Sequence, residues 1–573
     1  MDIRERPLPE HWQAHFATLP PLVGRLYAAR GMKDEGEAPL RLKDLYSPKL
    51  LGGIDQAVER IERAIRDNES IVISGDYDCD GATATTIAVR GLRLLGAMDV
   101  GFTIPDRFKH GYGLTPGLID DLCEHPKLII TVDSGVASHA GVAHAQALGI
   151  DVIITDHHLP GDTLPEGAVA IVNPNLKDDG FPSKALAGCG VMFYLLMALR
   201  ASMKEHGVFE GKPLPDLAEL LDIVAFGTIA DLVPLDANNR RLVRAGLQRI
   251  RSDQTHAGIR ALMAVAGIDG ESIEASDIAF FLAPRVNAAG RLENMRLGVE
   301  MLLADDDIQA MAYAQALDAI NQERRELQST MLEEAEAIVQ EMPKASGCVH
   351  VVYKPSWHAG VVGLVASKIK EAYHRPTVAF APGEEGSGLL HGSARSIPGF
   401  HLRDAFALVD VQHPGLIVKF GGHAMAAGLT IKEADLEAFH NAFESVVMTT
   451  MDPKLLQPVL WTDGALTLQE MSIETALALE SAGPWGQAFP EPCFENTFRV
   501  IGRTLIGKGH LKLLLEDLTG QKTFEAMAFN AWQDDVLTPW VKVVYALELN
   551  VWNSRTTLQL RVQHLAYLRE KPL

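Results

Sequence analysis

The sequence predicts an α/β protein of two lobes followed by a small β-barrel. Between about residues 55 and 235, short apolar runs alternate with amphipathic helical patterns. A second α/β segment covers about residues 346–450, and closely spaced strand patterns follow from about residue 455. The chain has 573 residues, which is the length of three or four domains at roughly 100–200 residues each. Each part is therefore long enough to form its own hydrophobic core.

The first lobe contains three strand-like runs, each followed by turn or acidic residues and then a helical pattern. The runs cover 71–73, 128–130 and 152–154, and two of the helical patterns cover 82–95 and 137–148. This repetition is typical of a parallel sheet with helices on both faces. Ligands of such sheets bind at the carboxyl ends of the strands, where we therefore expect the functional site.

Two helical segments follow the first lobe. Apolar residues at helical spacing over 217–228 place Asp231 at a helix end. The segment 293–341 holds twelve acidic and three basic residues and no Pro or Gly after Gly298, which predicts one continuous, solvated helix. The sequence leaves open whether this helix connects two lobes or simply lies on the surface.

The second lobe and the barrel are predicted from shorter patterns. The second α/β segment opens with the strand-like run 348–352, and residues 451–453 have the composition of a linker. Four strand patterns come after it, at 498–501, 511–515, 541–549 and 557–562. Short strands separated by Gly turns favour a small β-barrel.

Composition narrows the function classes. The chain carries 52 Lys and Arg against 74 Asp and Glu, a formal charge of −22, which excludes a basic protein that coats nucleic acid. A local basic groove is not excluded, because net charge does not describe the distribution of charge. The five cysteines include no Cys-x-x-Cys pair, which argues against a disulfide framework or a thiolate zinc site. We expect a cytoplasmic protein, since neither a secretory signal nor an apolar run of membrane-spanning length is visible.

The strongest local signal is the run Gly75-Asp76-Tyr77-Asp78-Cys79-Asp80-Gly81 directly after the first strand. Three carboxylates at alternate positions of a strand end repel one another unless a cation neutralises them. The run resembles the opening of an EF-hand, but that loop needs a Glu where this chain has Ile87. An aspartate that only caps a helix is the remaining alternative for any one of these residues.

Further acidic and histidine residues follow at corresponding places. Asp133 comes at the end of the second strand, and Asp156, His157 and His158 at the end of the third; Asp231 lies at its helix end. Carboxylates with one or two imidazoles suit Mn²⁺ or Mg²⁺ better than structural zinc. Helix capping does not explain the whole set, so we expect a divalent-metal site.

In order and spacing, these motifs resemble those of the DHH phosphoesterase superfamily. The resemblance implies a hydrolase in which two Mn²⁺ or Mg²⁺ ions hold the scissile phosphate. It implies Asp133 as the bridging ligand and Asp76, Asp78, Asp80, His157 and Asp231 as further ligands, with Asp156 in support. His157 and His158, together with Asp133, would act in catalysis. The chain departs from the usual pattern at Cys79 and Ser134, neither of which is a ligand position.

The second lobe carries candidate phosphate contacts. Phe420-Gly421-Gly422-His423 is similar to the signature of the DHHA1 domain that accompanies DHH domains, and His423 can donate to a scissile phosphate oxygen. Glycines there allow close backbone approach. Ser393 and Arg395 are two apart in a predicted strand and therefore point the same way. His358 lies in the same lobe, in Trp357-His358-x-Gly360.

Arginines of the first lobe lie in two Gly- or Asn-rich segments that we expect to be loops. One contains Arg107 and leads to Tyr112, and the other covers 283–292 with Arg285, Asn287 and Arg291. An isolated arginine is usually a solvated surface residue, but arginine in such a loop favours phosphate contact. We predict DNA or 5′-phosphate contacts at Arg107, Tyr112, Arg285, Asn287, Arg291, His358, Ser393, Arg395, Gly421, Gly422 and His423.

Together with the barrel, these segments resemble the single-strand-specific 5′→3′ DNA exonucleases of the superfamily, from about residue 55 to the end. The run 484–492, opening with Pro484-Trp485-Gly486, is similar to the turn that opens their oligonucleotide-binding (OB) fold. The resemblance implies that Arg107, Ser393 and Arg395 hold the 5′-terminal phosphate, that Arg285 contacts the backbone near the cut, and that the barrel holds single-stranded DNA.

We accordingly expect an enzyme that releases 5′-mononucleotides during DNA recombination and repair. The predicted division is an N-terminal extension (1–54), a DHH domain (55–290), a connecting helix (291–345), a DHHA1 domain (346–450) and an OB-fold domain (455–573). A single-stranded-DNA-binding protein and a repair helicase are the partners implied by resemblance, with no membrane and a monomeric enzyme. Two alternatives stay open: a phosphoesterase for pyrophosphate, short oligonucleotides or cyclic dinucleotides, and a non-catalytic nucleic-acid-binding protein.

Overall fold

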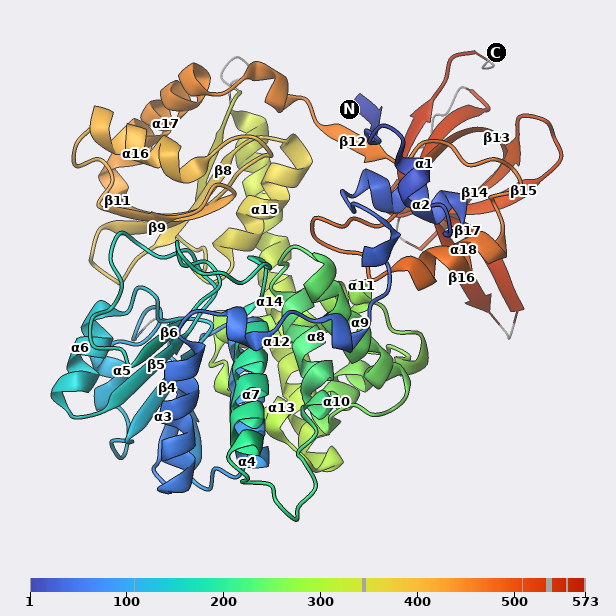
Figure 1. Cartoon of the computed structure of the whole chain (residues 1–573). Coiled ribbons are helices and arrows are strands. Elements are labelled where there is room, and N and C mark those ends of the chain that lie inside the picture. Colours follow the sequence, from blue (N-terminus) through green and yellow to red (C-terminus); the bar gives the residue numbers. More distant parts are fainter. Residues whose placement is uncertain are drawn as a thin grey trace. The chain divides into compact units, whose positions relative to one another are not determined.

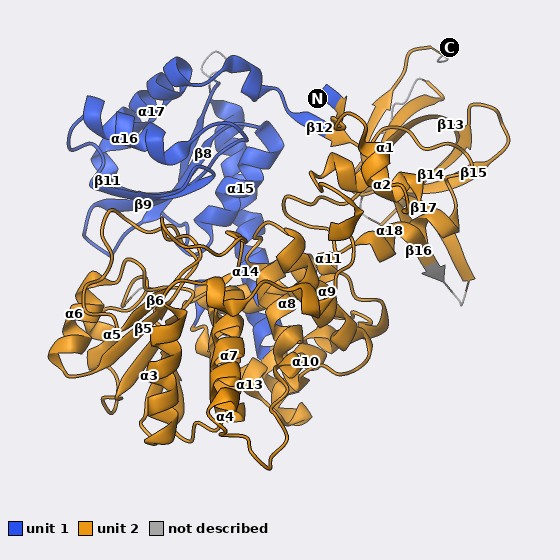
Figure 2. Ribbon diagram, viewed as in Figure 1, with its two compact units in different colours: residues 1–3, 291–293, 316–460 blue, residues 4–290, 294–315, 461–573 orange. Residues whose placement is uncertain are grey.

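The computed structural model describes residues 2–107, 109–342, 347–507, 509–531, 538–552 and 555–570. The chain divides into two compact units (Figures 1 and 2). Unit 1 comprises residues 1–3, 291–293 and 316–460, and unit 2 comprises residues 4–290, 294–315 and 461–573. Two short strands, β1 (Asp2–Glu5) and β12 (Val459–Thr462), pair with each other.

The first sheet of unit 2 is parallel and has the order β3-β2-β4-β5-β6. Its strands are β2 (Ile71–Ser74), β3 (Val100–Thr103), β4 (Leu128–Val132), β5 (Asp151–Thr155) and β6 (Ala170–Val172). The three strands predicted from apolar runs are confirmed. β3 and β6 were not predicted, because these strands are short and carry a weaker apolar signal.

Both faces of this sheet are covered. Ile129, Val152 and Ile154 belong to the core that contains residues of α5 (Pro116–Asp120) and α6 (His139–Ala147). Ile73, Ile130 and Ile153 alternate with them along the strands and are also fully buried. Burial on both faces is what a parallel sheet requires, so the predicted arrangement is confirmed.

The remaining helices of unit 2 pack on one another and, through α3, α4 and α7, on the sheet. Their bounds are α3 (Ile54–Arg66), α4 (Cys79–Leu94), α7 (Gly188–Glu205), η4 (Leu217–Leu220), α8 (Leu221–Ala230), α9 (Ala237–Arg251), α10 (Ala257–Ala266), η5 (Gly270–Ser272), α11 (Ala275–Asp277), the π-helix η6 (Ile278–Leu282), α12 (Ala283–Leu292) and α13 (Arg296–Leu303). Asp231 caps the carboxyl end of α8, as predicted.

Two predictions about this region were wrong. Residues 283–292 form helix α12 and not a loop. Gly290 is required within this helix, because an added Cβ would lie only 1.7 Å from the carbonyl oxygen of Tyr77. The segment 293–341 is not one helix, because α13 ends before Ala304, which is extended, and α14 covers Asp307–Glu341. Asp306 accepts a hydrogen bond from the Gln309 amide, and side-chain acceptance of this kind starts a new helix.

Unit 1 contains a five-stranded mixed sheet with the order β10-β11-β9-β8-β7. Only β7 (His350–Tyr353) and β8 (Thr377–Pro382) are parallel; β9 (Leu389–Arg395), β10 (Lys419–Gly422) and β11 (Ala426–Lys432) pair antiparallel. The helices are α15 (Val362–Tyr373), α16 (Leu402–Gln412) and α17 (Leu436–Thr450), with the short turns η7 (Glu433–Asp435) and η8 (Pro453–Leu456). η8 begins within the segment predicted to be a linker.

The C-terminal strands close into a barrel with the order β13-β14-β15-β17-β16. They are β13 (Phe494–Ile506), β14 (His510–Asp517), β15 (Thr523–Ala528), β16 (Trp540–Trp552) and β17 (Arg555–Tyr567), preceded by α18 (Ile473–Ala482). β15 was not predicted, because Glu525, Ala526 and Ala528 of this strand have weak strand propensity. Leu511, Leu513 and Leu515 of β14 alternate into the barrel core.

The N-terminal segment contributes to this barrel core. It contains α1 (Trp12–His15), α2 (Pro21–Ala29) and the turns η1 (Glu35–Glu37), η2 (Leu42–Asp44) and η3 (Pro48–Leu50). Leu26 of α2 is buried in the same cluster as the barrel strands, and the Tyr27 hydroxyl donates to the Ala482 carbonyl at 2.9 Å. Arg30 donates to both carboxylate oxygens of Asp463, at 2.9 and 3.0 Å. Residues near the start of the chain therefore stabilise its end.

No helix in the described ranges is both long and apolar enough to span a bilayer.

Replacing Leu26 should destabilise the barrel although this residue lies more than 400 positions before it. We expect Leu26→Ala to lower the free energy of unfolding of the C-terminal transition by about 2–5 kcal/mol, because a fully buried leucine leaves a cavity. Denaturant unfolding followed by tryptophan fluorescence measures it. Leu42→Ala, at a 40% exposed position, is the matched control, and equal effects of both variants would contradict the packing role.

Candidate functional site

The loop between β2 and α4 supplies three aspartates to one end of the sheet. Asp78 is the N-cap of α4 and accepts from the Gly81 amide at 3.0 Å. Asp80 is buried in the first turn of α4 and accepts from the amides of Gly188 and Cys189, at 2.6 and 3.0 Å, at the start of α7. Capping therefore explains part of the motif. Burial raises the pKa of Asp80, and the hydrogen bonds from the α7 N-terminus offset only part of this rise.

Asp133 lies at the centre of the site in a conformation that a non-glycine residue seldom adopts. Its φ is 56°, which costs free energy and is retained where the surrounding structure enforces it. A Cβ added to Gly188 would lie 2.5 Å from the Asp133 Cβ, so the start of α7 must be glycine for Asp133 to lie here. The Asp133 Oδ1 is 3.1 Å from the His157 Nε2.

Asp156 organises the two histidines that follow it. Its Oδ1 accepts from the amides of His157 and His158 and from the His158 Nδ1, at 2.7, 3.0 and 2.8 Å, and its Oδ2 accepts from the Val136 amide at 2.8 Å. Burial opposes its ionisation, but these hydrogen bonds hold the Asp156 pKa below its ordinary value. Asp156 is therefore saturated with donors and orients His158.

Two asparagines fix the same loop from the other side. Asn175 donates to the His157 carbonyl at 2.5 Å, and Asn173 donates to the His158 carbonyl at 2.9 Å. The sequence interpretation missed both asparagines and also Gly188. The segment Asn173-Pro174-Asn175 after β6 was a visible turn signal, but nothing in it indicated which loop it would hold.

The side chains that remain converge in three overlapping groups. One joins Asp76, Asp78 and Asp133, another joins Asp133, His157 and His158, and a third joins Asp80, His157 and Asp231, with the ligand atoms of each group within 4.8 Å of one another. Asp133 and His157 each belong to two groups. The structure thus brings together the ligand residues predicted from the sequence, from three strand ends and the end of α8.

The polar atoms at the centre lie close to one another but form no hydrogen bond in the described part of the chain. Within the described residues, Asp76 Oδ1, Asp133 Oδ1, His157 Nε2 and Asp231 Oδ2 are buried without a hydrogen bond. Burial and then neighbouring carboxylates raise the pKa of Asp133 well above its ordinary value, and the same causes raise those of Asp76 and Asp231. Unpartnered carboxylate oxygens and one imidazole nitrogen form the donor set that Mn²⁺ or Mg²⁺ prefers, so the residues fit divalent cations.

His157 differs from His158 in its electrostatic environment. Burial lowers the His157 pKa, and the neighbouring His158 lowers it further, which favours the neutral imidazole that ligates metal ions. Burial also acts against protonation of His158, but its hydrogen bond with Asp156 raises the His158 pKa. The pair therefore offers one ligand and one group able to hold a proton.

Aromatic residues and Arg107 line the rim of this site. The Arg107 guanidinium lies 4.1 Å from the centroid of the Tyr77 ring, and its buried Nε has no hydrogen-bond partner among the described residues. The Tyr112 hydroxyl is 3.3 Å from both the Asp133 carbonyl oxygen and the His158 Nδ1. The Arg107 guanidinium thus stacks on the Tyr77 ring, which leaves its N–H groups available to donate hydrogen bonds.

The predicted contacts on α12 serve the protein itself. The Asn287 Oδ1 accepts from the Cys79 amide at 2.9 Å and so holds the aspartate loop. Arg285 donates to the Phe281 carbonyl at 2.5 Å. Cys79 is buried, and burial keeps its pKa well above the ordinary value of a thiol, which makes it unreactive.

The phosphate-binding candidates of unit 1 cluster at one end of its sheet. The Arg395 Nη1 donates to the Ser393 Oγ at 3.0 Å, and a Cβ added at Gly363 would lie 2.9 Å from that oxygen and 3.0 Å from the Arg395 Nη2. Gly363 is in the first turn of α15, and helix N-termini bind anions. Burial lowers the Arg395 pKa, and no carboxylate pairs with Arg395 in the described part of the chain.

The Gly-Gly-His segment lies beside this cluster through strand register. Gly421 pairs with Gly428, Gly428 pairs with Ser393, and Ala426 pairs with Arg395. Gly422 has a φ of 134° and the His423 amide donates to the Ala426 carbonyl at 2.8 Å, which forms the tight turn that this glycine requires. Elsewhere in unit 1, the His358 Nδ1 accepts from the Gly360 amide at 3.1 Å, and Arg291 donates to the Gly360 carbonyl at 3.3 Å.

Three family models match the chain: the DHH family N-terminal domain over residues 70–228, the DHHA1 domain over 345–449 and the RecJ OB domain over 462–564. The chain is 48% identical over 558 residues to the single-stranded-DNA-specific exonuclease RecJ of Dickeya dadantii, which covers 96% of both chains. It is 46% identical over 559 residues to the Escherichia coli protein of that name, again with 96% of both chains covered.

Solved structures give the same match. The crystal structure of RecJ in complex with Mn²⁺ from Thermus thermophilus has a TM-score of 0.81 and 31% identity, covering 99% of this chain and 80% of that one. A crystal structure of exonuclease RecJ bound to manganese has a TM-score of 0.58 and 37% identity, with 70% of this chain and 96% of that one covered.

Without metal, the clustered aspartates should make stability fall as pH rises. A carboxyl whose pKa is raised by folding contributes stability that is present below its ordinary pKa of about 3.9 and is lost as pH rises through the folded value. Between pH 5 and 8 in EDTA, we expect the melting temperature of Asp231→Asn to fall less than that of the wild type, because the variant removes one of the buried, neighbouring carboxyls. Thermal melts at several pH values measure this. Identical pH profiles of the two proteins would contradict the repulsion, and saturating Mn²⁺ should reduce the wild-type loss.

Proposed function

The chain belongs to the RecJ family of single-stranded-DNA-specific exonucleases, and from this premise we propose that it removes 5′-mononucleotides stepwise from the 5′ end of single-stranded DNA. It is a hydrolase that uses two divalent cations, Mn²⁺ or Mg²⁺. The observation that carries the proposal is the set of buried, unpartnered carboxylate oxygens around Asp133. We assign the activity to DNA recombination and repair.

The metal ligands we propose are Asp76, Asp78, Asp80, Asp133, His157 and Asp231. When bound, a divalent cation polarises the phosphodiester and acidifies water. Asp133 is common to two of the three groups, which supports a bridging role. His158, held by Asp156 and next to the Tyr112 hydroxyl, is placed to exchange a proton, and Asp156 holds it in orientation.

The 5′-phosphate contacts we propose are Arg107, Ser393 and Arg395, with His423 acting on the scissile phosphate. Support comes from Arg107 stacked on Tyr77, from the Ser393–Arg395 pair and from the helix start at Gly363. Guanidinium groups bind phosphate through two parallel hydrogen bonds. For Tyr112, Arg285, Asn287, Arg291, His358, Gly421 and Gly422 we propose supporting roles along the DNA, several of them through the loops that these residues hold.

The proposed domain division is 1–54, 55–290, 291–345, 346–450 and 455–573, as predicted from the sequence, and the matched ranges of the three family models support it. The chain acts on single-stranded DNA. We propose a monomeric, cytoplasmic enzyme whose protein partners are a single-stranded-DNA-binding protein and a repair helicase. A phosphoesterase for pyrophosphate or short nucleotides gives no reason for the closed barrel, so we do not favour it.

Replacing the central ligand should abolish hydrolysis. Asp133→Ala should reduce release of labelled mononucleotide from 5′-labelled single-stranded DNA with Mn²⁺ by more than about a hundredfold, because changes beside metal ligands already cost 10–100-fold. Asp55→Ala, at an exposed position at the start of α3, is the control. Cleavage of pyrophosphate or a dinucleotide far faster than of a 20-mer by the wild type would contradict the proposal.

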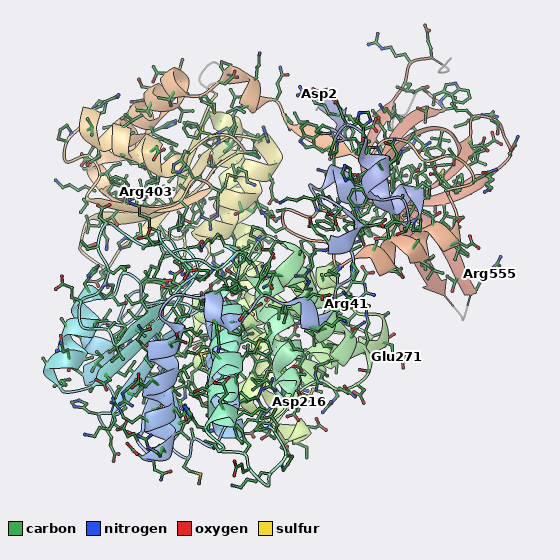
Figure 3. All side chains as sticks on the ribbon, viewed as in Figure 1. Asp2, Arg41, Asp216, Glu271, Arg403 and Arg555 are labelled. Carbon is green, nitrogen blue, oxygen red and sulfur yellow. The ribbon has the colours of Figure 1, made fainter. Side chains whose placement is uncertain are left out.

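The Arg395 guanidinium, which can donate two parallel hydrogen bonds, should determine the preference of the enzyme for a 5′-phosphorylated DNA end. We expect Arg395→Ala to reduce kcat/KM about 10–100-fold on 5′-phosphorylated DNA and much less on 5′-hydroxyl DNA, as hydrogen bonds to a charged group contribute about 1.5–3 kcal/mol. Arg395→Lys keeps the positive charge but not the pair of parallel N–H donors, so it should retain only part of the wild-type kcat/KM on 5′-phosphorylated DNA. Arg403→Ala, at an exposed position near the start of α16 (labelled in Figure 3), is the matched control. Equal losses on both substrates would exclude this role.

A further inference from the structure

Two segments of unit 2 that hold proposed metal ligands meet at the start of α9. Residues 183–187 lead into α7, whose first amides bond to Asp80 and whose Gly188 leaves room for Asp133. Residues 231–236 run from Asp231 to the N-cap of α9. Neither segment is a helix or a strand, so the positions of both depend on the bonds that their polar groups form with other parts of the chain.

Asn239, in the first turn of α9, bonds to both segments. Its Nδ2 donates to the Ala185 carbonyl at 2.5 Å and to the Pro234 carbonyl at 2.9 Å. A side-chain amide carries two N–H groups and can therefore serve both carbonyls at once. Asn239 is fully buried, and its Oδ1 forms no hydrogen bond within the described residues. The side-chain hydrogen bonds of Asn239 therefore join these two segments.

A second side-chain bond joins the same segments. The Ser183 Oγ donates to the Asp236 Oδ2 at 2.6 Å, and the Asp236 Oδ1, as the N-cap of α9, accepts from the Asn239 amide at 2.9 Å. The carboxylate that starts α9 thus also fixes the place of Asn239. We refer to Ser183, Asp236 and Asn239 as the α9 clamp, because their bonds connect 183–187 with 231–236.

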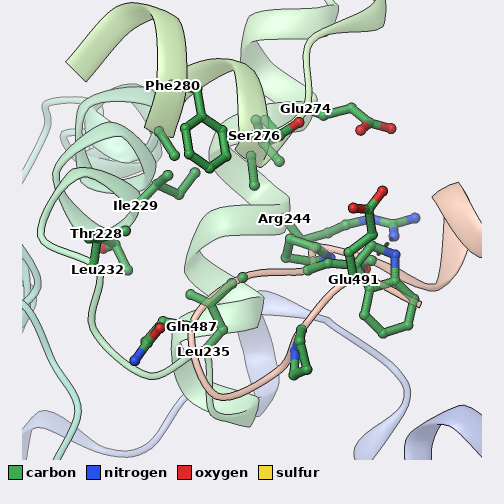
Figure 4. A pocket seen from close by; sticks show the side chains of 18 of the residues that line it. Thr228, Ile229, Leu232, Leu235, Arg244, Glu274, Ser276, Phe280, Gln487 and Glu491 are labelled. Atoms are coloured by element: carbon green, nitrogen blue, oxygen red, sulfur yellow. Dashed lines mark hydrogen bonds between the residues drawn. The ribbon is translucent and has the colours of Figure 1, made fainter. Parts of the chain in front are cut away.

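The turn that follows Asp231 needs such a restraint. Leu232 has a φ of 58°, a left-handed conformation that costs free energy and persists only where the surroundings enforce it. Farther along, the Leu235 amide donates to the Gln487 carbonyl at 2.8 Å, and Figure 4 shows both residues where the two backbone segments pass each other. The α9 clamp bonds to the carbonyl that lies between these two points. It therefore acts on the short stretch of backbone that leads away from Asp231.

Asp80 and Asp231 come from different helices but offer ligand atoms to one group. Together with a His157 nitrogen, these atoms lie within 4.8 Å of one another. Asp80 lies in the first turn of α4 and is bonded to the start of α7, whereas Asp231 lies at the end of α8. The separation of the two carboxylates accordingly depends on how the start of α7 lies relative to the turn after α8. The α9 clamp joins these two places.

We propose that Asn239 is a positioning residue, which holds Asp231 at the correct distance from Asp80 and Asp133 for the binding of divalent cations. The inference rests on the proposed metal ligands and deepens that assignment, since Asn239 acts through the backbone of the ligand segments and not on the cations themselves. Changes to residues that orient metal ligands cost about 10–100-fold in metal affinity or activity. Loss of the clamp should therefore weaken cation binding and leave the rate of the fully loaded enzyme nearly unchanged.

Calorimetric titration of the full chain with Mn²⁺, without DNA, is the first test. Asn239→Ala should raise the Kd for Mn²⁺ about tenfold, the lower end of the range for such changes, and the Mn²⁺ concentration that gives half-maximal release of mononucleotide from 5′-phosphorylated single-stranded DNA should rise by the same factor. The rate at saturating Mn²⁺ should stay close to that of the wild type. An unchanged Kd, or a loss of rate that saturating Mn²⁺ does not restore, would overturn the proposal.

Asn238→Ala is the matched control. Asn238 is the adjacent residue of α9 and is equally buried, but its Oδ1 accepts from the Tyr194 hydroxyl at 2.8 Å and from the Tyr46 amide at 3.4 Å. Each variant leaves buried polar groups without a partner, so both should lower the melting temperature of the metal-free protein. Only Asn239→Ala should raise the Kd for Mn²⁺. Equal increases in both variants would show that general destabilisation weakens metal binding, and this result would refute the positioning role.

Two further variants test the bonds of the clamp one at a time. Asn239→Asp keeps the shape of the side chain but presents oxygen to the two carbonyls, so it should raise the Kd at least as much as Asn239→Ala. Ser183→Ala removes only the bond to Asp236 and should raise the Kd by a smaller factor. The two changes combined should give less than the product of the single effects, because both residues stabilise the same connection. If Asn239→Ala does not fold, Ser183→Ala decides, and a wild-type Kd in that variant would overturn the clamp.

The proposed function and the positioning role fail in different ways. If the wild-type protein binds no Mn²⁺ or does not degrade the oligonucleotide, the proposed function fails. If it does both and Asn239→Ala binds Mn²⁺ with the wild-type Kd, only the positioning role fails.

Discussion

Mutual repulsion between buried carboxylates is the constraint on which the catalytic unit depends. Five aspartates and two histidines offer ligand atoms within three overlapping groups. In a medium of low dielectric constant, so many like charges are unfavourable unless cations neutralise them. Burial raises the pKa of Asp76, Asp80, Asp133 and Asp231, and the neighbouring carboxylates add to this rise. A fold that keeps these groups together needs strong local restraints.

Those restraints come from the backbone around the site. The amides at the start of α7 hold Asp80, Gly188 leaves space for the left-handed Asp133, and Asp156 collects four donors to orient the histidine pair. Asn287 holds the aspartate loop from α12. The groups that hold the ligands are thus mostly uncharged, so they fix the geometry without relieving the repulsion, and that relief is left to the cations.

The net charge of −22 is compatible with a DNA-processing enzyme, because much of the negative charge lies in one acidic segment and in the proposed metal ligands. The segment 293–341 alone holds twelve acidic against three basic residues, and several of the other acids are the proposed ligands. Phosphate is expected at a few buried or stacked guanidinium groups, such as Arg395 and Arg107, and not on a broad basic surface. The affinity for bulk DNA should accordingly depend only moderately on salt.

Sequence patterns predicted the parallel sheet, the carboxylate positions and the barrel, because strand periodicity and strand-end acids are local properties of the chain. They failed at 283–292 and at Ala304, where glycine, asparagine and aspartate acquire their roles through partners such as the Tyr77 carbonyl and the Gln309 amide. By itself the sequence determined which residue types stand at the strand ends and hence the metal chemistry. Only the tertiary structure decided that Gly188 makes room for Asp133, that Leu26 completes the barrel core, and that Asn239 bonds to Ala185, because these contacts join residues far apart in the chain.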